Sequence, residues 1–420
     1  MRILLINDHY PPEGGGTAQV VKNLAEGFTQ AGHDVLALAS CDDKVSSEIA
    51  LSGGGRVRFL PVRYPLRLRS YLSLWNPKAV VELKREVEKF VPDVIFVHNI
   101  HSYFSYRSLV LLKKVGVPLV LTLHDVMTIA YGKAWPREKK CETSWRISWF
   151  DNLKKARKQY NPFRSFFVKR CLKFSDRILC VSEALRKVLA ENGIIADGVA
   201  HNGLPQDVLC QMKQKPFESH AVRSVLDKIQ REHKKIILFG GRLSPAKGGK
   251  ELLSAVRHLL KQYGAALVVA GEGPEKIRLQ AMANRYGLQN EIFFLGQVSE
   301  ADMHALYSSA YCVLVPSISF DSFPTMNLEA MQHKKPVVAG CFGGSREAVA
   351  DGKTGYIVNP YDISALGSVV GKLLLSPELA HAMGEAGYDR LMQNFTVKEQ
   401  VKKLLAIAEE IKHNENQSAK

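Results

Sequence analysis

Short apolar runs alternate with helical segments along this chain, and the alternation constrains the fold more than any other feature of the sequence. It is typical of α/β proteins with a parallel sheet, whose ligands bind beyond the carboxyl ends of the strands. The pattern pauses at Gln206–Lys235, where apolar residues are sparse, and restarts at Ile236. A chain of 420 residues is long enough for two domains with separate cores. The runs expected to form strands are Arg2–Asn7, Val35–Ala39, Asp93–Val97, Leu119–Leu123, Arg177–Val181, Ile236–Phe239, Ala266–Ala270, Ile292–Gly296 and Ala310–Pro316.

The composition is that of a globular protein with an unusual charge. Hydrophobic residues make up 46% of the chain, and the formal net charge is +16. The seven cysteines are odd in number and lack CxxC spacing, which favours a reducing compartment, argues against a disulfide framework and leaves packing as their expected role. MRILLIN runs directly into a strand pattern, and no window approaches about 18 consecutive apolar residues, so we expect neither a signal peptide nor a transmembrane helix. The expected location is the cytoplasm.

A basic and aromatic insertion at residues 133–177 carries most of the charge excess, with 14 Lys or Arg against 4 Asp or Glu, a net charge of +10. A solvated helical hairpin with a packed aromatic face is one interpretation. An anionic membrane surface or a lipid-linked acceptor is another, because rings and cations suit the headgroup region. Single-stranded nucleic acid is the least favoured partner. The aromatic residues concerned are Trp135, Trp145, Trp149, Phe150, Phe163, Phe166 and Phe167.

The stretch Phe320–Met331 predicts a loop that leads into a helix. Pro324 has a preset φ and lacks an N–H donor, so it fits the first helical turn. Asp321 then lies just before the helix and Glu329 inside it, where the two carboxylates reach different parts of one extended ligand. The free N–H groups between them favour a phosphate.

Two further segments suit an anionic ligand. Gly14–Gly16 follows the first strand and precedes a helix, and residues without a Cβ let the backbone approach a phosphate. Arg242 and Lys247 flank a glycine-rich turn after the strand at Ile236–Phe239. Two cations at this spacing can stabilise a diphosphate without a metal.

Three histidines, His98, His101 and His124, lie near the carboxyl ends of two expected strands. They lack HxxxH or HExxH spacing, so a metal site is disfavoured, and a structural role is the default interpretation for each.

Taken in order, these motifs resemble those of the retaining glycosyltransferases of family 4, which use nucleotide-sugar donors. The resemblance extends from Met1 to about residue 410, except for the insertion and the linker. The chain departs from the family at Asp321, where Glu is usual, and at Leu204-Pro205 after the Asn-Gly turn. The matching segments are GGG at 14–16, His124-Asp125, Asn202-Gly203, GRLSPAK at 241–247, GEGP at 271–274, and Asp321 and Glu329 separated by seven residues.

The resemblance implies a GT-B fold, in which two doubly wound, Rossmann-like domains face a cleft. Residues 1–205 would bind the acceptor and 206–385 the nucleotide sugar, while a helix at 386–412 would cross back to the first domain. The implied reaction moves a sugar from a nucleoside diphosphate to a hydroxyl of a glycan or lipid-linked acceptor, with anomeric retention. It serves cell-surface polysaccharide or glycolipid synthesis, and a UDP sugar is the expected donor.

The resemblance also implies a role for each matching residue. His124 would contact the donor sugar, Asp321 would orient it, and Glu329 would bind the ribose. Arg242 and Lys247 would bind the diphosphate. No metal or further cofactor is expected. The other donor contacts implied are Gly15, Gly16, Gly271, Val298, Phe323, Pro324, Thr325 and Met326.

A protein of another class fits the same sequence. A catalytically weakened GT-B protein would bind nucleic acid or another polyanion through the basic insertion, and Asp321 would mark the lost activity. It predicts steep salt dependence of binding and no turnover of sugar nucleotides. An NAD dehydrogenase is disfavoured, because the first loop lacks GxGxxG spacing. The sequence makes no prediction of the oligomeric state.

Overall fold

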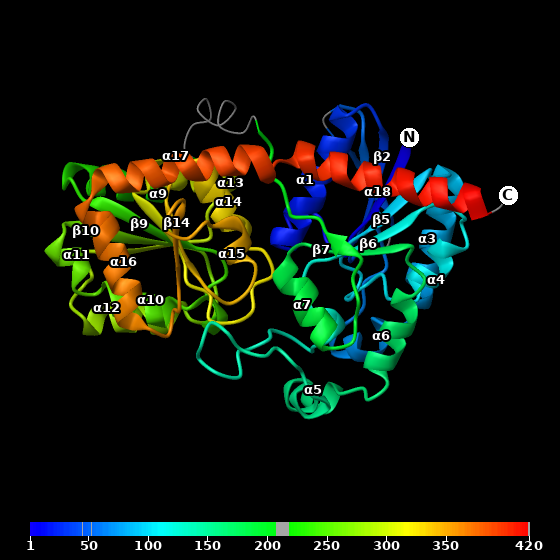
Figure 1. The fold of residues 1–420 in the computed structure, drawn as a ribbon, viewed down its shortest axis with the longest axis horizontal. Coiled ribbons are helices and arrows are strands. Elements are labelled where there is room, and N and C mark those ends of the chain that lie inside the picture. The colour runs from blue at the N-terminus through cyan, green and yellow to red at the C-terminus, as the bar shows by residue number, and fades with distance from the viewer. Residues whose placement is uncertain (44, 52, 207–217, 419–420) are drawn as a thin grey trace. The chain divides into compact units, whose positions relative to one another are not determined.

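The computed structural model describes residues 1–43, 45–51, 53–206 and 218–418. The chain forms two compact units, each with one sheet and its own helices (Figure 1). The first unit comprises Met1–Ala134, Arg146–Pro205 and Thr396–Lys420. The second comprises Trp135–Trp145 and Gln206–Phe395. The sequence-based boundary placed all of 133–177 in the first domain, whereas the contacts of Trp135–Trp145 lie in the second unit.

The first unit is built on an eight-stranded sheet of order β3-β4-β2-β1-β5-β6-β7-β8. Its strands are parallel except for β3, which runs antiparallel to β4. In the central register, Leu5 lies beside Ala37 of β2 and Phe96 of β5. The strands are β1 (Arg2–Ile6), β2 (Asp34–Ser40), β3 (Ser47–Ala50), β4 (Arg56–Leu60), β5 (Val94–Val97), β6 (Leu119–Leu123), β7 (Arg177–Cys180) and β8 (Gly198–Val199).

Helices cover this sheet and close its core. Apolar residues of the first and last helices, among them Leu24, Phe28, Val401 and Leu404, pack with the sheet in one buried cluster. The helices are α1 (Gly16–Gln30), η1 (Leu66–Leu68), α2 (Arg69–Leu72), α3 (Pro77–Phe90), α4 (Ser108–Lys113), η2 (Val126–Thr128), α5 (Trp149–Ala156), η3 (Arg157–Gln159), α6 (Arg164–Leu172), α7 (Glu183–Glu191) and α18 (Val397–Ser418).

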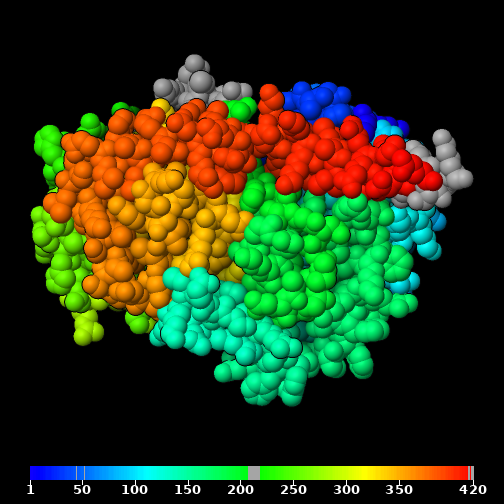
Figure 2. Space-filling model, in the orientation of Figure 1, coloured from blue at the N-terminus to red at the C-terminus, as the bar shows by residue number. Residues whose placement is uncertain are grey.

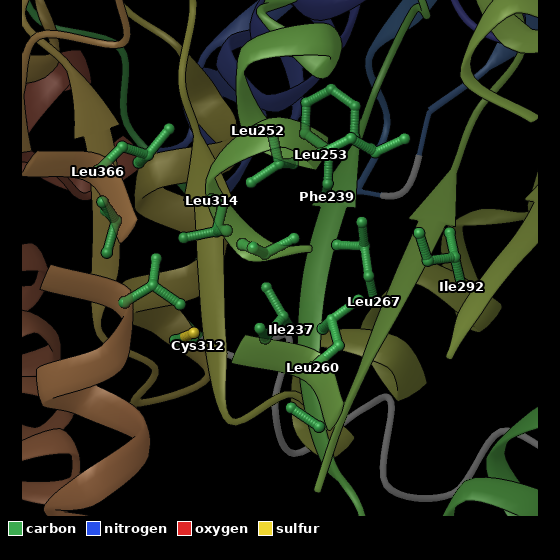
Figure 3. Close-up of a cluster of buried hydrophobic side chains, with 14 of the residues drawn as sticks. Ile237, Phe239, Leu252, Leu253, Leu260, Leu267, Ile292, Cys312, Leu314 and Leu366 are labelled. Atoms are coloured by element: carbon green, nitrogen blue, oxygen red, sulfur yellow. The ribbon is translucent and has the colours of Figure 1, made fainter. Parts of the chain in front are cut away.

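The second unit is built on a six-stranded parallel sheet of order β11-β10-β9-β12-β13-β14. Figure 3 shows part of its core, where Ile237, Phe239 and Leu267 of the sheet meet Leu252 and Leu253 of a covering helix. The strands are β9 (Lys235–Gly240), β10 (Ala265–Ala270), β11 (Ile292–Gly296), β12 (Cys312–Val315), β13 (Val337–Gly340) and β14 (Gly355–Val358). The helices are α9 (His220–Arg231), η4 (Pro245–Lys247), α10 (Gly249–Val256), α11 (Leu259–Gln262), α12 (Lys276–Arg285), α13 (Glu300–Ser309), α14 (Thr325–Gln332), α15 (Ser345–Ala348), α16 (Ile363–Leu375) and α17 (Pro377–Asn394).

No single helix of the described residues is long and apolar enough to cross a membrane. The pair α16 and α17 passes this test jointly by length and composition, but the two helices meet at an angle of 101°. Buried residues of α16, such as Leu366 and Val370, belong to the core of the second unit. The apolar residues of this helix pair therefore pack within the second unit.

The expected strands all occur, with ends shifted by a few residues, and the low-apolar stretch Gln206–Lys235 contains α9. Its residues 207–217 lie outside the described part of the chain. The helix expected at 386–412 is instead two helices, α17 in the second unit and α18 in the first.

The prediction that the cysteines serve only for packing is wrong for two of them. Cys141 and Cys341 form a disulfide across a sequence separation of 200 residues. Spacing gave no sign of it, because the two residues meet only when Trp135–Trp145 folds onto the second unit. The free cysteines of the described residues are Cys41, Cys171, Cys180 and Cys312, and Cys210 lies outside those residues.

The core of the second unit provides a test of the packing. Leu267 is 0% exposed in β10, whereas Leu375 at the end of α16 is 65% exposed. We expect Leu267→Ala to lower the free energy of unfolding by about 2–5 kcal/mol, since it removes buried methyl groups and leaves a cavity. Leu375→Ala should change it by less than about 0.5 kcal/mol. Denaturant titration of both variants measures the difference, and equal losses would contradict this assignment of the core.

Candidate functional site

Loops at the carboxyl ends of β9 and β10 meet closely in the second unit. Gly271 has φ of +138°, and a Cβ added there would lie 2.0 Å from the carbonyl oxygen of Gly241. The N–H of Leu243 donates to the carbonyl oxygen of Glu272 at 2.8 Å. Only glycine fits position 271, since both the backbone conformation and the space exclude a side chain. The predicted residue Gly271 therefore holds the turn that carries Arg242.

An ion pair joins the turn after β9 to the loop before α14. Nζ of Lys247 lies 2.6 Å from Oδ2 of Asp321, and Oγ of Ser317 donates to the same carboxylate oxygen at 3.1 Å. Both charged side chains are half-buried. Arg242 is exposed, and its guanidinium makes no ion pair within the part of the chain that the structure describes. Asp321 offsets the charge of Lys247, and the exposed guanidinium of Arg242 on the same turn suits an anion.

Helix α14 presents its first turn beside this pair. It begins at Thr325, with Pro324 as the N-cap residue, one position later than the sequence predicted. No side chain caps the helix, and the first-turn bond runs from the N–H of Asn327 to the carbonyl oxygen of Pro324. Uncapped N–H groups at a helix start favour anionic groups.

Glu329 lies one turn further along α14 in a polar contact. The hydroxyl of Tyr307 donates to its Oε2 at 2.6 Å, and the Thr325 side chain also hydrogen-bonds to the carboxylate. Burial raises the pKa of Glu329, and the two hydrogen bonds oppose that shift. Burial and the nearby Glu329 charge raise the pKa of Tyr307 well above its usual value. The phenol thus stays protonated, and the carboxylate retains acceptor capacity for hydroxyl groups.

The other predicted residues of the second unit differ in what they can offer. The ring of Phe323 is buried and lies 5.7 Å from the ring of Phe395, so its side chain serves packing. Met326 reaches Gly240 at the end of β9, where an added Cβ would lie 3.0 Å from its Cε. Val298 is half-buried and immediately precedes Ser299, the N-cap residue of α13.

In the first unit, the carboxyl ends of β5 and β6 bring two histidines into contact. Nδ1 of His98 lies 2.9 Å from Nε2 of His124, and both residues are buried. Burial lowers the pKa of His98 to about 3. Burial, then the neighbouring His98 and His101, lower the pKa of His124 well below its usual value. His124 is therefore a neutral hydrogen-bonding group at physiological pH.

Asn99 connects Thr17, which follows the glycine loop, to Asp125, which follows His124. Nδ2 of Asn99 lies 3.3 Å from Oγ1 of Thr17, in the first turn of α1, and 3.4 Å from Oδ2 of Asp125. Gly15 is the N-cap residue of α1 with φ of +99°, and a Cβ at Gly15 or Gly16 would meet nothing within 4 Å. The backbone at the start of α1 is thus open to a ligand on the side of His124-Asp125.

The structure places the predicted residues in two sets, one on each unit. Lys247 contacts Asp321 directly, and Glu329 lies on the helix that follows; His124 and the glycine loop form the second set. Sequence reasoning missed Tyr307 and the pairing of His98 with His124. Only the placement of both histidines after strands indicated the pair. No group of three or more His, Cys, Asp or Glu side chains in the described residues is arranged to hold a metal ion.

The histidine pair predicts an acid-sensitive stability. The pKa of His98 is about 3 in the folded chain and near its ordinary value of 6.5 in the unfolded chain, so between these values only the unfolded chain binds the proton. Stability is therefore full above pH 6.5 and falls with pH by about 1.4 kcal/mol per unit for each such histidine. We expect His98→Asn to flatten the fall between pH 6.5 and 5 in denaturant titrations. Leu267→Ala, a control, should lower stability at every pH without altering that slope; an unchanged slope in His98→Asn would contradict the assignment.

The family model described as Glycosyltransferase Family 4 matches residues 14–207, and that described as Glycosyl transferases group 1 matches residues 226–390. A glycogen synthase of Mycobacterium tuberculosis is 24% identical over 94% of this chain and 91% of its own length. A GDP-mannose-dependent phosphatidylinositol monomannoside mannosyltransferase of Mycolicibacterium smegmatis is 32% identical, over 38% of this chain and 44% of its own length.

Solved structures agree on the fold. Sucrose-phosphate synthase from Thermosynechococcus elongatus has a TM-score of 0.74 at 20% identity, over 98% of this chain and 99% of its own. Anabaena HepE in complex with UDP has a TM-score of 0.69 at 18% identity, over 98% of this chain and all of its own. The predicted GT-B fold is confirmed. Together with the two family models, which cover most of the sequence, these similarities show that the chain belongs to the group 1 and family 4 glycosyltransferases and is a hexosyltransferase.

Proposed function

We propose that this enzyme transfers a sugar from a UDP sugar, with retention of anomeric configuration, to a hydroxyl of a glycan or lipid-linked acceptor. The reaction serves polysaccharide or glycolipid synthesis on the cytoplasmic side of a membrane. The observation that carries the proposal is the Lys247–Asp321 ion pair at 2.6 Å, because it joins a cation for the diphosphate to a carboxylate for the sugar. HepE, a structural neighbour, binds UDP and UDP-glucose, which supports the choice of nucleotide.

The diphosphate is the part of the donor that these residues suit best. Arg242 and Lys247, on the turn after β9, supply positive charge, and the first turn of α14, which follows the loop of Asp321, supplies N–H donors. Together they stabilise the charge that grows on the leaving diphosphate. We propose that the reaction needs no metal, and retention of activity in a chelator tests this.

The two carboxylates and His124 bind the ribose and the sugar of the donor. Glu329 accepts hydrogen bonds from the ribose hydroxyls, while Tyr307 and Thr325 hold its carboxylate in place. Asp321 orients the sugar, and neutral His124 hydrogen-bonds to it. The bond from the anomeric carbon to the diphosphate oxygen breaks while the acceptor oxygen forms its bond on the same face. The leaving phosphate oxygen takes the proton of the acceptor hydroxyl.

Substitution of the two cations tests the diphosphate assignment. We expect Arg242→Ala and Lys247→Ala each to lower kcat/KM by about 10²–10³-fold, since each removes charge that acts on the transition state. Both should also reduce the rise in melting temperature that UDP or a UDP sugar gives the wild type. The matched control is Lys250→Ala, because Lys250 is an exposed lysine three residues beyond Lys247. Full transfer by either cation variant would rule out the diphosphate role.

We also propose that helices α5 and α6 dock on an anionic membrane. One interpretation of the sequence was a helical hairpin whose aromatic side chains are packed. Four of these rings are instead exposed: Trp149, Phe150, Phe163 and Phe166 are 68%, 60%, 72% and 67% exposed. Figure 2 shows this green-teal part of the first unit at the molecular surface. Basic residues accompany the rings, among them Lys154, Lys158 and Arg170. On this surface the rings would enter the headgroup layer and the cations would contact anionic lipid. Such a surface suits a lipid-linked acceptor.

Vesicle co-sedimentation tests the docking surface. We expect the wild type to sediment with phosphatidylglycerol vesicles and not with phosphatidylcholine vesicles, because charge and rings act together. Trp149→Ser with Phe150→Ser should weaken binding at least about tenfold. Ile277→Ser, which changes an exposed apolar residue on α12 of the other unit, should leave it unchanged. Failure to bind at low salt would defeat the membrane proposal, and tighter binding to single-stranded RNA would favour the polyanion alternative.

A further inference from the structure

An irregular segment crosses from the first unit to the second and is fixed there by a disulfide. We call Trp135–Trp145 the strap. The chain leaves the first unit after Ala134 and re-enters it at Arg146, and the strap contains neither helix nor strand. Its Cys141 is bonded to Cys341, just after β13. In Figure 2 the turquoise atoms of this part of the chain lie against the orange atoms of the second unit.

Further contacts hold the strap on the same surface. Glu142 pairs with Arg346 at 2.7 Å, and Nδ2 of Asn359 donates to the carbonyl oxygen of Lys139 at 2.8 Å. Nζ of Lys139 lies 5.0 Å from the centre of the Tyr361 ring. These groups are mostly exposed, and exposed ion pairs stabilise little. These polar contacts therefore add little to the covalent attachment that the disulfide provides.

The last residue of the strap reaches the donor site. The Trp145 ring packs edge-on against the rings of Phe320 and Phe342, at centroid distances of 5.1 and 6.2 Å. Phe320 immediately precedes Asp321, so the contact is one residue from the carboxylate that holds Lys247.

The loop that carries Cys341 also holds the backbone of Asp321. The N–H of Asp321 donates to the carbonyl oxygen of Phe342 at 3.0 Å, and the N–H of Gly344 donates to the carbonyl oxygen of Asp321 at 2.9 Å. Gly343, with φ of +120°, lets the two loops approach, since a Cβ there would lie 2.0 Å from the Asp321 oxygen. The strap thus contacts two loops at Asp321. Trp145 packs against Phe320 in the loop of Asp321 itself, and Cys141 is bonded to Cys341 in the loop that hydrogen-bonds to Asp321.

We propose that the strap positions Asp321 and that the Cys141–Cys341 disulfide makes this positioning dependent on redox state. The inference rests on the proposed function in two respects, the assignment of Asp321 to the donor sugar and the placement of the enzyme in the cytosol. A dithiol supplies the two electrons and two protons of reduction: the S–S bond breaks, both cysteines become thiols, and the dithiol closes to a disulfide. Cys141 is half-buried and Cys341 buried, so Cys141 is the more exposed residue of the pair.

The expected role of this disulfide depends on the compartment in which the enzyme is placed. In the reducing cytosol, where we place the enzyme, disulfides are uncommon, and those that form are typically redox-sensing or catalytic. Neither cysteine belongs to the residues assigned to transfer. A switch is therefore the role that fits a disulfide beside, but outside, the donor site.

Amide hydrogen exchange tests the positioning without any assay of transfer. We expect a Cys141–Cys341 peptide in a non-reducing digest, and about tenfold faster exchange of the Asp321 and Gly344 amides after dithiothreitol, because their hydrogen bonds lose support. Cys141→Ser should show the fast exchange without reductant. Cys41→Ser, which removes a half-buried free cysteine of the first unit, should respond like the wild type. Absence of the linked peptide, or exchange unchanged by reduction, would overturn the proposal.

Kinetics then separates a positioning role from a merely structural one. With a UDP sugar, we expect reduction or Trp145→Ala to lower kcat about tenfold, because a displaced group misaligns the reacting sugar, while KM for the donor changes little. Trp145→Phe, which keeps a ring against Phe320, should restore most of kcat. An unchanged kcat despite faster exchange would overturn the positioning of Asp321. No turnover by either redox form would reject the proposed function, and the exchange measurement would still decide the strap.

Discussion

The backbone pairing of Asp321 with Phe342 and Gly344 is the constraint on which the site of the second unit depends. It joins the loop after β12 to the loop after β13, and the Lys247–Asp321 ion pair then adds the turn after β9. Parallel strands place these loops at one edge of the sheet, but the sheet alone does not fix their mutual distances. A displacement of either loop would change the 2.6 Å contact between Lys247 and Asp321. The site is thus held chiefly by loop-to-loop contacts.

Both units place polar side chains at the carboxyl ends of parallel strands, but the side chains differ in charge. At the carboxyl edge of the second sheet, Arg242 is exposed and Lys247 is paired with Asp321, just before the helix that begins at Thr325. At the carboxyl edge of the first sheet, burial keeps His98 and His124 neutral. A charged group binds a diphosphate strongly, whereas a neutral imidazole can hydrogen-bond to a sugar hydroxyl without holding an anion. The difference in charge between the two sites therefore follows from the residue types, and burial of the two imidazoles widens it by lowering their pKa values.

The sequence predicted the repeated α/β pattern well, because period and length distinguish buried parallel strands from the helices between them. It also predicted that Asp321 lies just before a helix and Glu329 inside it, since these residues are close along the chain. It failed where function depends on tertiary contacts between distant segments. The Tyr307–Glu329 hydrogen bond, the His98–His124 contact and the Cys141–Cys341 disulfide each join residues whose spacing carries no periodic signal. Pro324 was displaced by one position, because a proline serves equally before the first helical residue.

The basic insertion shows why composition identifies a surface more readily than its role. Aromatic and basic residues are interleaved throughout 133–177, and the sequence gives no reason to divide the segment. The structure divides it at Trp145. That ring packs against Phe320 and Phe342 in the second unit, whereas Trp149, four residues later, is exposed on the first. One basic and aromatic segment therefore includes both a ring that packs beside Asp321 and a ring that is exposed. The two differ in whether a neighbouring side chain covers the ring.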